Sequence, residues 1–90
     1  MNNTRRKKIK EIKTMLEEIA EKTDELLIEI EEILDEEQSC LDNIPEALQN
    51  TDRTEKMEET IENLQEAIDA VENATGEINL ACEYLDEAME

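Results

Sequence analysis

Apolar side chains recur every three or four residues along almost the whole chain, and most of the positions between them are carboxylates. The first series is Ile9, Ile12, Leu16, Ile19, Thr23, Leu26, Ile30, Ile33, Glu37 and Cys40. The second is Thr54, Met57, Ile61, Leu64, Ile68, Val71, Thr75, Ile78, Cys82, Leu85 and Met89. A mean step of about 3.5 residues keeps one stripe of a helix against a partner helix. The pattern predicts an all-α fold with two long helices packed in a coiled-coil seam.

The segment from Asp42 to Glu46 separates the two series. Pro45 disfavours the α conformation at Ile44 and suits the first position of a new helical turn. We expect a first helix over about 4–41, a turn over about 42–52 that contains one helical turn at 45–49, and a second helix over about 53–89. Together they form one domain, residues 1–90, because a chain of this length holds one small core.

Residues with capping side chains stand before both predicted helices. Thr4 can cap the first helix, and Asn50, Thr51 or Asp52 can cap the second. Asp52 and Glu55 have the spacing of a capping box.

A connection of this length returns the second helix antiparallel to the first. When paired residue numbers add to 94, apolar positions meet along the whole seam, as in the pair of Ile33 with Ile61. Glu37 then lies opposite Met57, near the open turn, where its charge can remain hydrated.

Further apolar stripes flank the predicted seam, and they suggest that the hairpin has a partner. On the first helix the stripe begins at Ala20 and contains Leu27, Leu34 and Leu41. On the second helix it contains Ala67, Ala74, Ala81 and Ala88. These two stripes are expected on opposite sides of the seam, each half exposed. A single two-helix seam is also a small core. We therefore expect a homodimer in which the leucine stripe of one hairpin packs on the alanine stripe of another, giving a four-helix bundle.

Composition narrows the function further. The chain has one Tyr and no Phe, Trp or His, and its longest aliphatic run is three residues long. Nothing in it is predicted to span a bilayer or to direct export, and two cysteines without a CxxC motif indicate free thiols. We expect a cytoplasmic protein, because free thiols are typical of a reducing compartment.

Catalysis and cofactor binding are not predicted. Without His, and with Ser39 as the single serine, the usual nucleophile–base pairs cannot form. The acidic run from Asp35 to Asp42 lacks the central glycine of a calcium loop. We expect a non-enzymatic protein without a metal or cofactor.

The net charge of −18 is distributed unevenly. Residues 1–13 hold six basic side chains and one acid, whereas residues 14–90 hold 26 acids and three basic side chains. The basic segment can be neutralised internally by Glu83, Asp86, Glu87 and Glu90, or it can contact nucleic acid or a membrane.

The acidic surface is the main functional signal. The twenty-six carboxylates of residues 14–90 are spread over a rod about 55 Å long, and they approach the charge density of duplex DNA, which has one phosphate per about 1.7 Å. Such a rod could occupy the basic groove of a nucleic-acid-binding protein; alternatively, the acids only solvate the helices. Leu80 and Tyr84 break the polar outer face and could anchor a partner. The predicted partner-binding residues are Glu25, Glu29, Glu32, Asp35, Glu36, Glu62, Glu66, Asp69, Leu80 and Tyr84.

The turn sequence and several acidic repeats are similar to those of short acidic helical-hairpin proteins of phages and mobile elements of Gram-positive bacteria. The resemblance rests on the segments 5–8, 35–38, 42–49, 57–59 and 66–70. It implies a mobile-element setting, in which small acidic proteins, anti-CRISPR proteins among them, block host nucleases.

Three functional hypotheses follow from the sequence. The first is an acidic protein-binding module, in its sharpest form a DNA mimic that inhibits a host defence nuclease. The second is a homo-oligomeric structural or adaptor bundle, and the third is a nucleic-acid binder that acts through residues 5–13.

Overall fold

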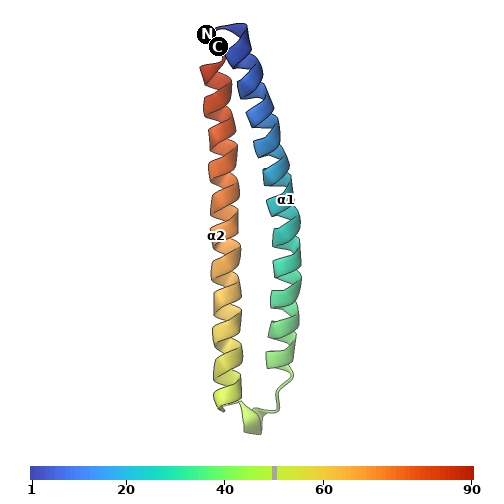
Figure 1. Ribbon diagram of the computed structural model, residues 1–90. Coiled ribbons are helices and arrows are strands. Elements are labelled where there is room, and N and C mark those ends of the chain that lie inside the picture. The colour runs from blue at the N-terminus through green and yellow to red at the C-terminus, as the bar shows by residue number, and fades with distance from the viewer. Residues whose placement is uncertain (50) are drawn as a thin grey trace.

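The chain folds into a long antiparallel helical hairpin (Figure 1). The computed structural model describes residues 1–49 and 51–90, and within them it contains helix α1 (Asn3–Asp42), a short 3-10 helix η1 (Glu46–Leu48) and helix α2 (Asp52–Ala88). The Cα trace measures 70 × 15 × 13 Å, and both termini lie together at the end opposite the turn. The prediction of an all-α hairpin is confirmed, and α1 and α2 begin and end within one residue of the predicted bounds.

The cap of α1 differs from the predicted one, whereas the cap of α2, Thr51, is one of the predicted candidates. Asn2 caps α1, because its side chain accepts a hydrogen bond from the Arg5 N–H at 2.8 Å; the predicted cap, Thr4, lies inside the helix. Thr51 caps α2 and forms a capping box with Thr54. The predicted pair Asp52 and Glu55 is therefore displaced by one position, and the candidate cap Asn50 lies outside the described residues.

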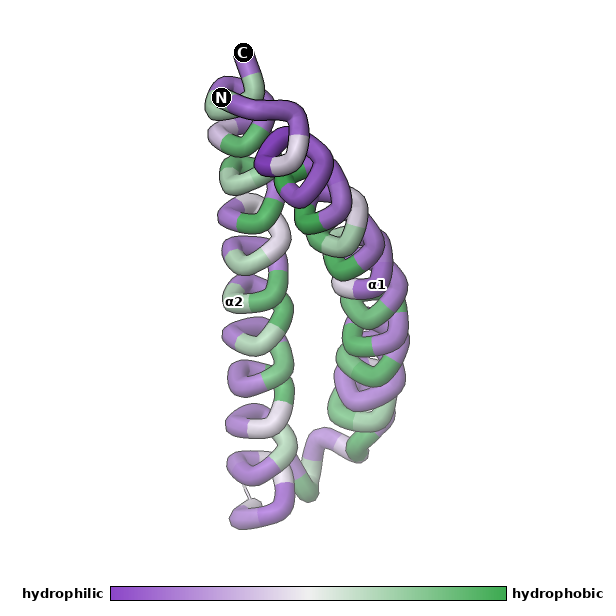
Figure 2. Tube along the Cα trace, turned by 45° about the horizontal axis from the view of Figure 1, so that its top comes forward, coloured by the Kyte–Doolittle hydropathy of each residue, from purple (hydrophilic) through white to green (hydrophobic). Residues whose placement is uncertain are grey.

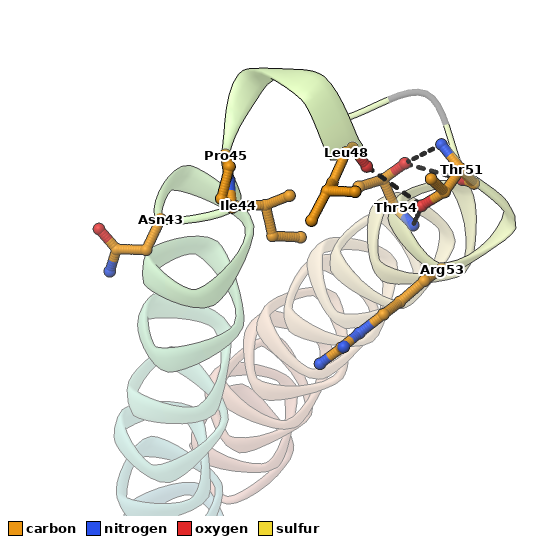
Figure 3. A pocket seen from close by; sticks show the side chains of 7 residues that line it. All are labelled: Asn43, Ile44, Pro45, Leu48, Thr51, Arg53 and Thr54. Carbon is orange, nitrogen blue, oxygen red and sulfur yellow. Dashed lines mark hydrogen bonds between the residues drawn. The ribbon is translucent and has the colours of Figure 1, made fainter.

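Thr54 ties the start of α2 to the turn (Figure 3). It is 1% exposed, and its hydroxyl group shares one proton between the carbonyl oxygens of Gln49 and Thr51, the latter at 2.8 Å. The same oxygen accepts a hydrogen bond from the Thr51 N–H at 3.0 Å. One buried hydroxyl group thus satisfies backbone groups at a helix end that would otherwise lack partners.

The seam of α2 is the predicted one, whereas that of α1 is shifted by one stripe. On α2 the five buried residues all belong to the predicted series, and they are Thr54, Ile61, Ile68, Thr75 and Cys82. On α1 the covered positions are Arg6, Ile9, Lys13, Leu16, Ala20, Thr23, Leu27, Ile30, Leu34, Glu37 and Leu41. The prediction that Leu27, Leu34 and Leu41 flank the seam is wrong, since all three lie half-buried within it.

The register also differs from the prediction. Thr23 and Thr75 face each other across the seam with their hydroxyl oxygens 2.6 Å apart, and their residue numbers add to 98 rather than 94. The salt bridge between Lys13 and Asp86 agrees with this alignment to within one residue. Glu37 is consequently level with Ile61 rather than Met57, one helical turn farther from the connection.

Both changes have one physical cause. α1 carries three adjacent apolar stripes with the same seven-residue spacing, and a two-helix seam covers only two of them. In the structure, α2 packs on the stripe that contains Ala20 and Leu27, and the stripe that contains Ile19 and Leu26 remains exposed. The heptad spacing alone does not distinguish these arrangements, because both satisfy it.

Candidate functional site

The hairpin has two chemically different sides, which the seam separates. Equivalent positions on two antiparallel helices lie on the same side of the pair, because a twofold axis perpendicular to the helices exchanges them. Ile12, Ile19, Leu26 and Ile33 each immediately precede a seam residue of α1, and we call them the isoleucine stripe. Ala67, Ala74, Ala81 and Ala88 each immediately precede a seam residue of α2, and we call them the alanine stripe. The two stripes therefore run next to each other on one side, the apolar side.

The isoleucine stripe is far from buried. The exposed fractions are 46% for Ile12, 49% for Ile19, 40% for Leu26 and 49% for Ile33, and the adjoining Met15 is 54% exposed. The hydropathy-coloured trace shows hydrophobic residues recurring along both helices (Figure 2). The structure thus combines isoleucines with alanines on one side, where the sequence predicted that leucines and alanines would lie on opposite sides.

The residues that directly follow a seam residue lie on the other side of the hairpin, which we call the acidic side. Within α1 and α2 they include thirteen carboxylates. These are Glu17, Glu21, Asp24, Glu31, Asp35, Asp42, Glu55, Glu58, Glu62, Asp69, Glu72, Glu83 and Asp86, all of them exposed. The basic residues of this side are Lys7 and Lys10.

The apolar side has a different charge balance. Its stripes and the residues one helical turn before them include Arg5, Lys8, Lys22, Arg53 and Lys56 as cations. The anions there are Glu29, Glu36 and Glu77. The net negative charge of the chain therefore lies on the acidic side and on the outward backs of the helices.

The predicted partner-binding carboxylates are exposed but do not form one face. Asp35, Glu62 and Asp69 lie on the acidic side, whereas Glu29 and Glu36 border the apolar side. The remaining three lie on the outward backs of the helices, and they are Glu25, Glu32 and Glu66. Sequence reasoning missed Glu17, Asp24, Glu31, Glu58 and Glu72, which become a row only when the seam is assigned correctly.

Leu80 and Tyr84 are exposed, as predicted, at 39% and 62%. Leu80 lies on the back of α2, whereas Tyr84 lies one helical turn before Ala88 and thus borders the apolar side. The pair therefore joins the back of α2 to the apolar side.

The basic segment is partly neutralised within the hairpin. Lys13 Nζ lies 2.7 Å from the Asp86 carboxylate, and Arg6 Nε donates a hydrogen bond of 3.0 Å to the carbonyl oxygen of Met89. The hydrogen bond with Asp86 raises the pKa of Lys13 above its ordinary value of 10.5. Arg6 also places a cation at the carbonyl end of α2, where the helix dipole is negative.

The remaining features offer little chemistry. Cys40 is exposed and Cys82 is buried, and both are free thiols. In the part of the chain that the structure describes, no three His, Cys, Asp or Glu side chains are grouped to hold a metal ion. An open hollow of about 460 Å³ at the turn is lined by Ile44, Pro45, Leu48, Arg53 and neighbouring residues (Figure 3).

Neither helix of the described residues is long and apolar enough to cross a membrane. No family model matches the chain, and no curated protein or solved structure is significantly similar to it.

Proposed function

We propose that this chain is a non-enzymatic protein-binding module whose acidic side occupies the basic groove of a nucleic-acid-binding protein. The observation that carries the proposal is the separation of charge, with thirteen exposed carboxylates and two basic residues on one side of a long hairpin. A surface with one sign of charge steers an oppositely charged partner and selects against others.

The spacing of the charges supports mimicry of a nucleic-acid strand. α2 has 37 residues and is about 55 Å long, so the thirteen carboxylates follow one another at about 4 Å along the axis. Phosphates of one strand of duplex DNA follow one another at about 3.4 Å. A basic groove that follows a strand would therefore meet charges at a similar interval on the acidic side.

The setting that we propose is inhibition of a defence nuclease in the cytoplasm of a bacterial host cell. It rests on the resemblance of the turn and the acidic repeats to small proteins of phages and mobile elements. Blocking a nuclease by occupying its groove needs no catalytic group in the inhibitor, which suits a chain without histidine.

Affinity capture with matched variants tests the proposal. The immobilised protein is exposed to a bacterial lysate treated with nuclease, and bound proteins are eluted with duplex DNA or RNA. We expect DNA- or RNA-binding proteins in the eluate, and their loss when Glu58→Gln, Glu62→Gln and Asp69→Asn are combined. The control combines Glu29→Gln, Glu36→Gln and Glu77→Gln, which removes equal charge from the border of the apolar side and should retain binding.

Two results would contradict mimicry. The first is a captured protein that binds nucleic acid and the hairpin simultaneously, and the second is equal loss of capture in both variants.

A structural or adaptor bundle is the second candidate function, and the exposed isoleucine stripe favours it. The third hypothesis, nucleic-acid binding through residues 5–13, is weakened because Lys13 and Arg6 already contact α2.

A further inference from the structure

We infer that the apolar side is an interface between two copies of this chain, which lie with both turns at the same end. The isoleucine stripe of each copy packs on the alanine stripe of the other, and the four helices form a bundle. This inference is independent of the proposed function, since the acidic side remains exposed in the pair.

Side-chain size determines which stripes meet. Within one hairpin the isoleucine and alanine stripes run next to each other, and Leu26 and Ala74 lie at nearly the same height in the register set by Thr23 and Thr75. A twofold axis parallel to the helices places the isoleucine stripe of each copy opposite the alanine stripe of the other copy. Large side chains then face small ones in every layer, which is the packing that fills a core without voids.

Charge on the apolar side permits contact between two acidic chains. Five cations and three anions border this side, so the approach of two copies here does not bring their carboxylates together. With the turns at the same end, Lys22 comes level with the partner's Glu77, and Met15 comes level with the partner's Tyr84. Contact between two acidic sides would instead oppose thirteen carboxylates to thirteen.

The exposed area agrees with a small, stable interface. Ile12, Met15, Ile19, Leu26 and Ile33 are each 40–54% exposed. If such a residue has about 180 Å² to expose, these five leave roughly 400 Å² uncovered, the size of patch that marks an interaction site. With the alanine stripe, two copies would bury on the order of 1,000 Å², the lower limit for a specific interface.

The small size of the hairpin's own core also favours association with a second copy. Among the described residues, the buried apolar side chains are Ala20, Ile61, Ile68 and Cys82, and every other apolar seam position is only partly covered. Small domains with so little core are usually completed by oligomerisation. A second copy on the apolar side would bury the seam residues from the open side as well.

Sedimentation equilibrium with three proteins tests the interface. We expect the wild type to have twice the mass of the chain at micromolar concentration, and Ile19→Glu combined with Leu26→Glu to halve that mass. Ile28→Glu is the matched control: Ile28 is 58% exposed but lies away from the apolar side, so this variant should stay dimeric. A monomeric wild type at about 100 μM, or a dimeric Ile19→Glu/Leu26→Glu variant, would overturn the inference.

A distance measurement tests the alignment while the isoleucine and alanine stripes stay unchanged. A spin label is placed in the turn by Ala47→Cys, in a background with Cys40→Ser and Cys82→Ala. With both turns at one end we expect a distance between labels below about 30 Å, since four neighbouring helices are each about 10 Å across. Turns at opposite ends would separate the labels by nearly the 70 Å length of the hairpin, and that result would overturn the proposed alignment.

Discussion

Thr23 and Thr75 place their hydroxyl oxygens 2.6 Å apart in the middle of an otherwise mostly apolar seam. Thr23 also lies 2.7 Å from the carbonyl oxygen of Ala20, and Thr75 lies 3.0 Å from that of Val71. Two hydroxyl protons serve three contacts, so one threonine donates across the seam and the other donates to its own helix. A polar pair at one level of a coiled coil favours the register in which both members meet.

The two threonines should be energetically coupled. We expect Thr23→Val and Thr75→Val each to destabilise the fold slightly, and the double variant to be close to the wild type, because valine has nearly the same shape. The interaction energy should be about 1 kcal/mol in a double-mutant cycle measured by urea unfolding. Strictly additive effects would show that the contact across the seam contributes no stability.

Thr54 should contribute more to the free energy of unfolding than an exposed threonine within a helix. Thr54→Ala removes the hydroxyl group that accepts from the Thr51 N–H and donates to the carbonyl oxygens of Gln49 and Thr51. The Thr54 N–H retains its hydrogen bond to the Thr51 side chain, so we expect a loss of about 1–2 kcal/mol from the missing hydroxyl group alone. Thr14→Ala is the control, since Thr14 is exposed and only contacts the Lys10 carbonyl oxygen of its own helix. Urea unfolding should show the control within about 0.5 kcal/mol of the wild type; an equal loss in both variants would contradict the role of the cap.

Gly76 should be replaceable with a gain in stability. It lies inside α2, and a Cβ atom added there would meet no atom within 4 Å. Gly76→Ala should stabilise the fold by up to about 1 kcal/mol, because alanine loses less backbone entropy in a helix. Thermal unfolding followed by circular dichroism measures the change, and a lower melting temperature would indicate that a partner approaches the backbone at this position.

The salt bridge of Lys13 should appear in the pH dependence of stability. The pKa of Lys13 is raised in the folded state by its hydrogen bond with Asp86, so the stabilising contribution is fully present below the ordinary lysine pKa. It is lost as the pH rises through the higher folded value. We expect the stability difference between the wild type and Lys13→Met to narrow above pH 10.5, and the difference in urea midpoint at several pH values measures it.

If the stability difference between the wild type and Lys13→Met stays constant through the alkaline range, the salt bridge does not contribute in this way. Asp86→Asn offers a second control, because it removes the charge that raises the lysine pKa while retaining a polar side chain. In that variant the alkaline change should disappear.

Much of the fold follows from local rules in the sequence. The repeated steps of three and four residues specify two helices, and Pro45 ends the first of them because the residue before proline avoids the α conformation. The short connection then requires an antiparallel return, and the lack of histidine restricts the chemistry. These features depend only on near neighbours in the chain, so they could be derived before any tertiary contact was known.

The choice of the seam on α1 was decided by the tertiary structure alone. Leu27 and Leu26 belong to adjacent stripes of equal spacing, and each stripe satisfies the heptad pattern equally well. The selection depends on what α2 presents at each level, such as Thr75 opposite Thr23 and Asp86 beside Lys13. Such pairings join residues more than fifty positions apart in the sequence, and a pattern of local spacing contains no information about them. For that reason the acidic and apolar sides of the hairpin become visible only when both helices are in place.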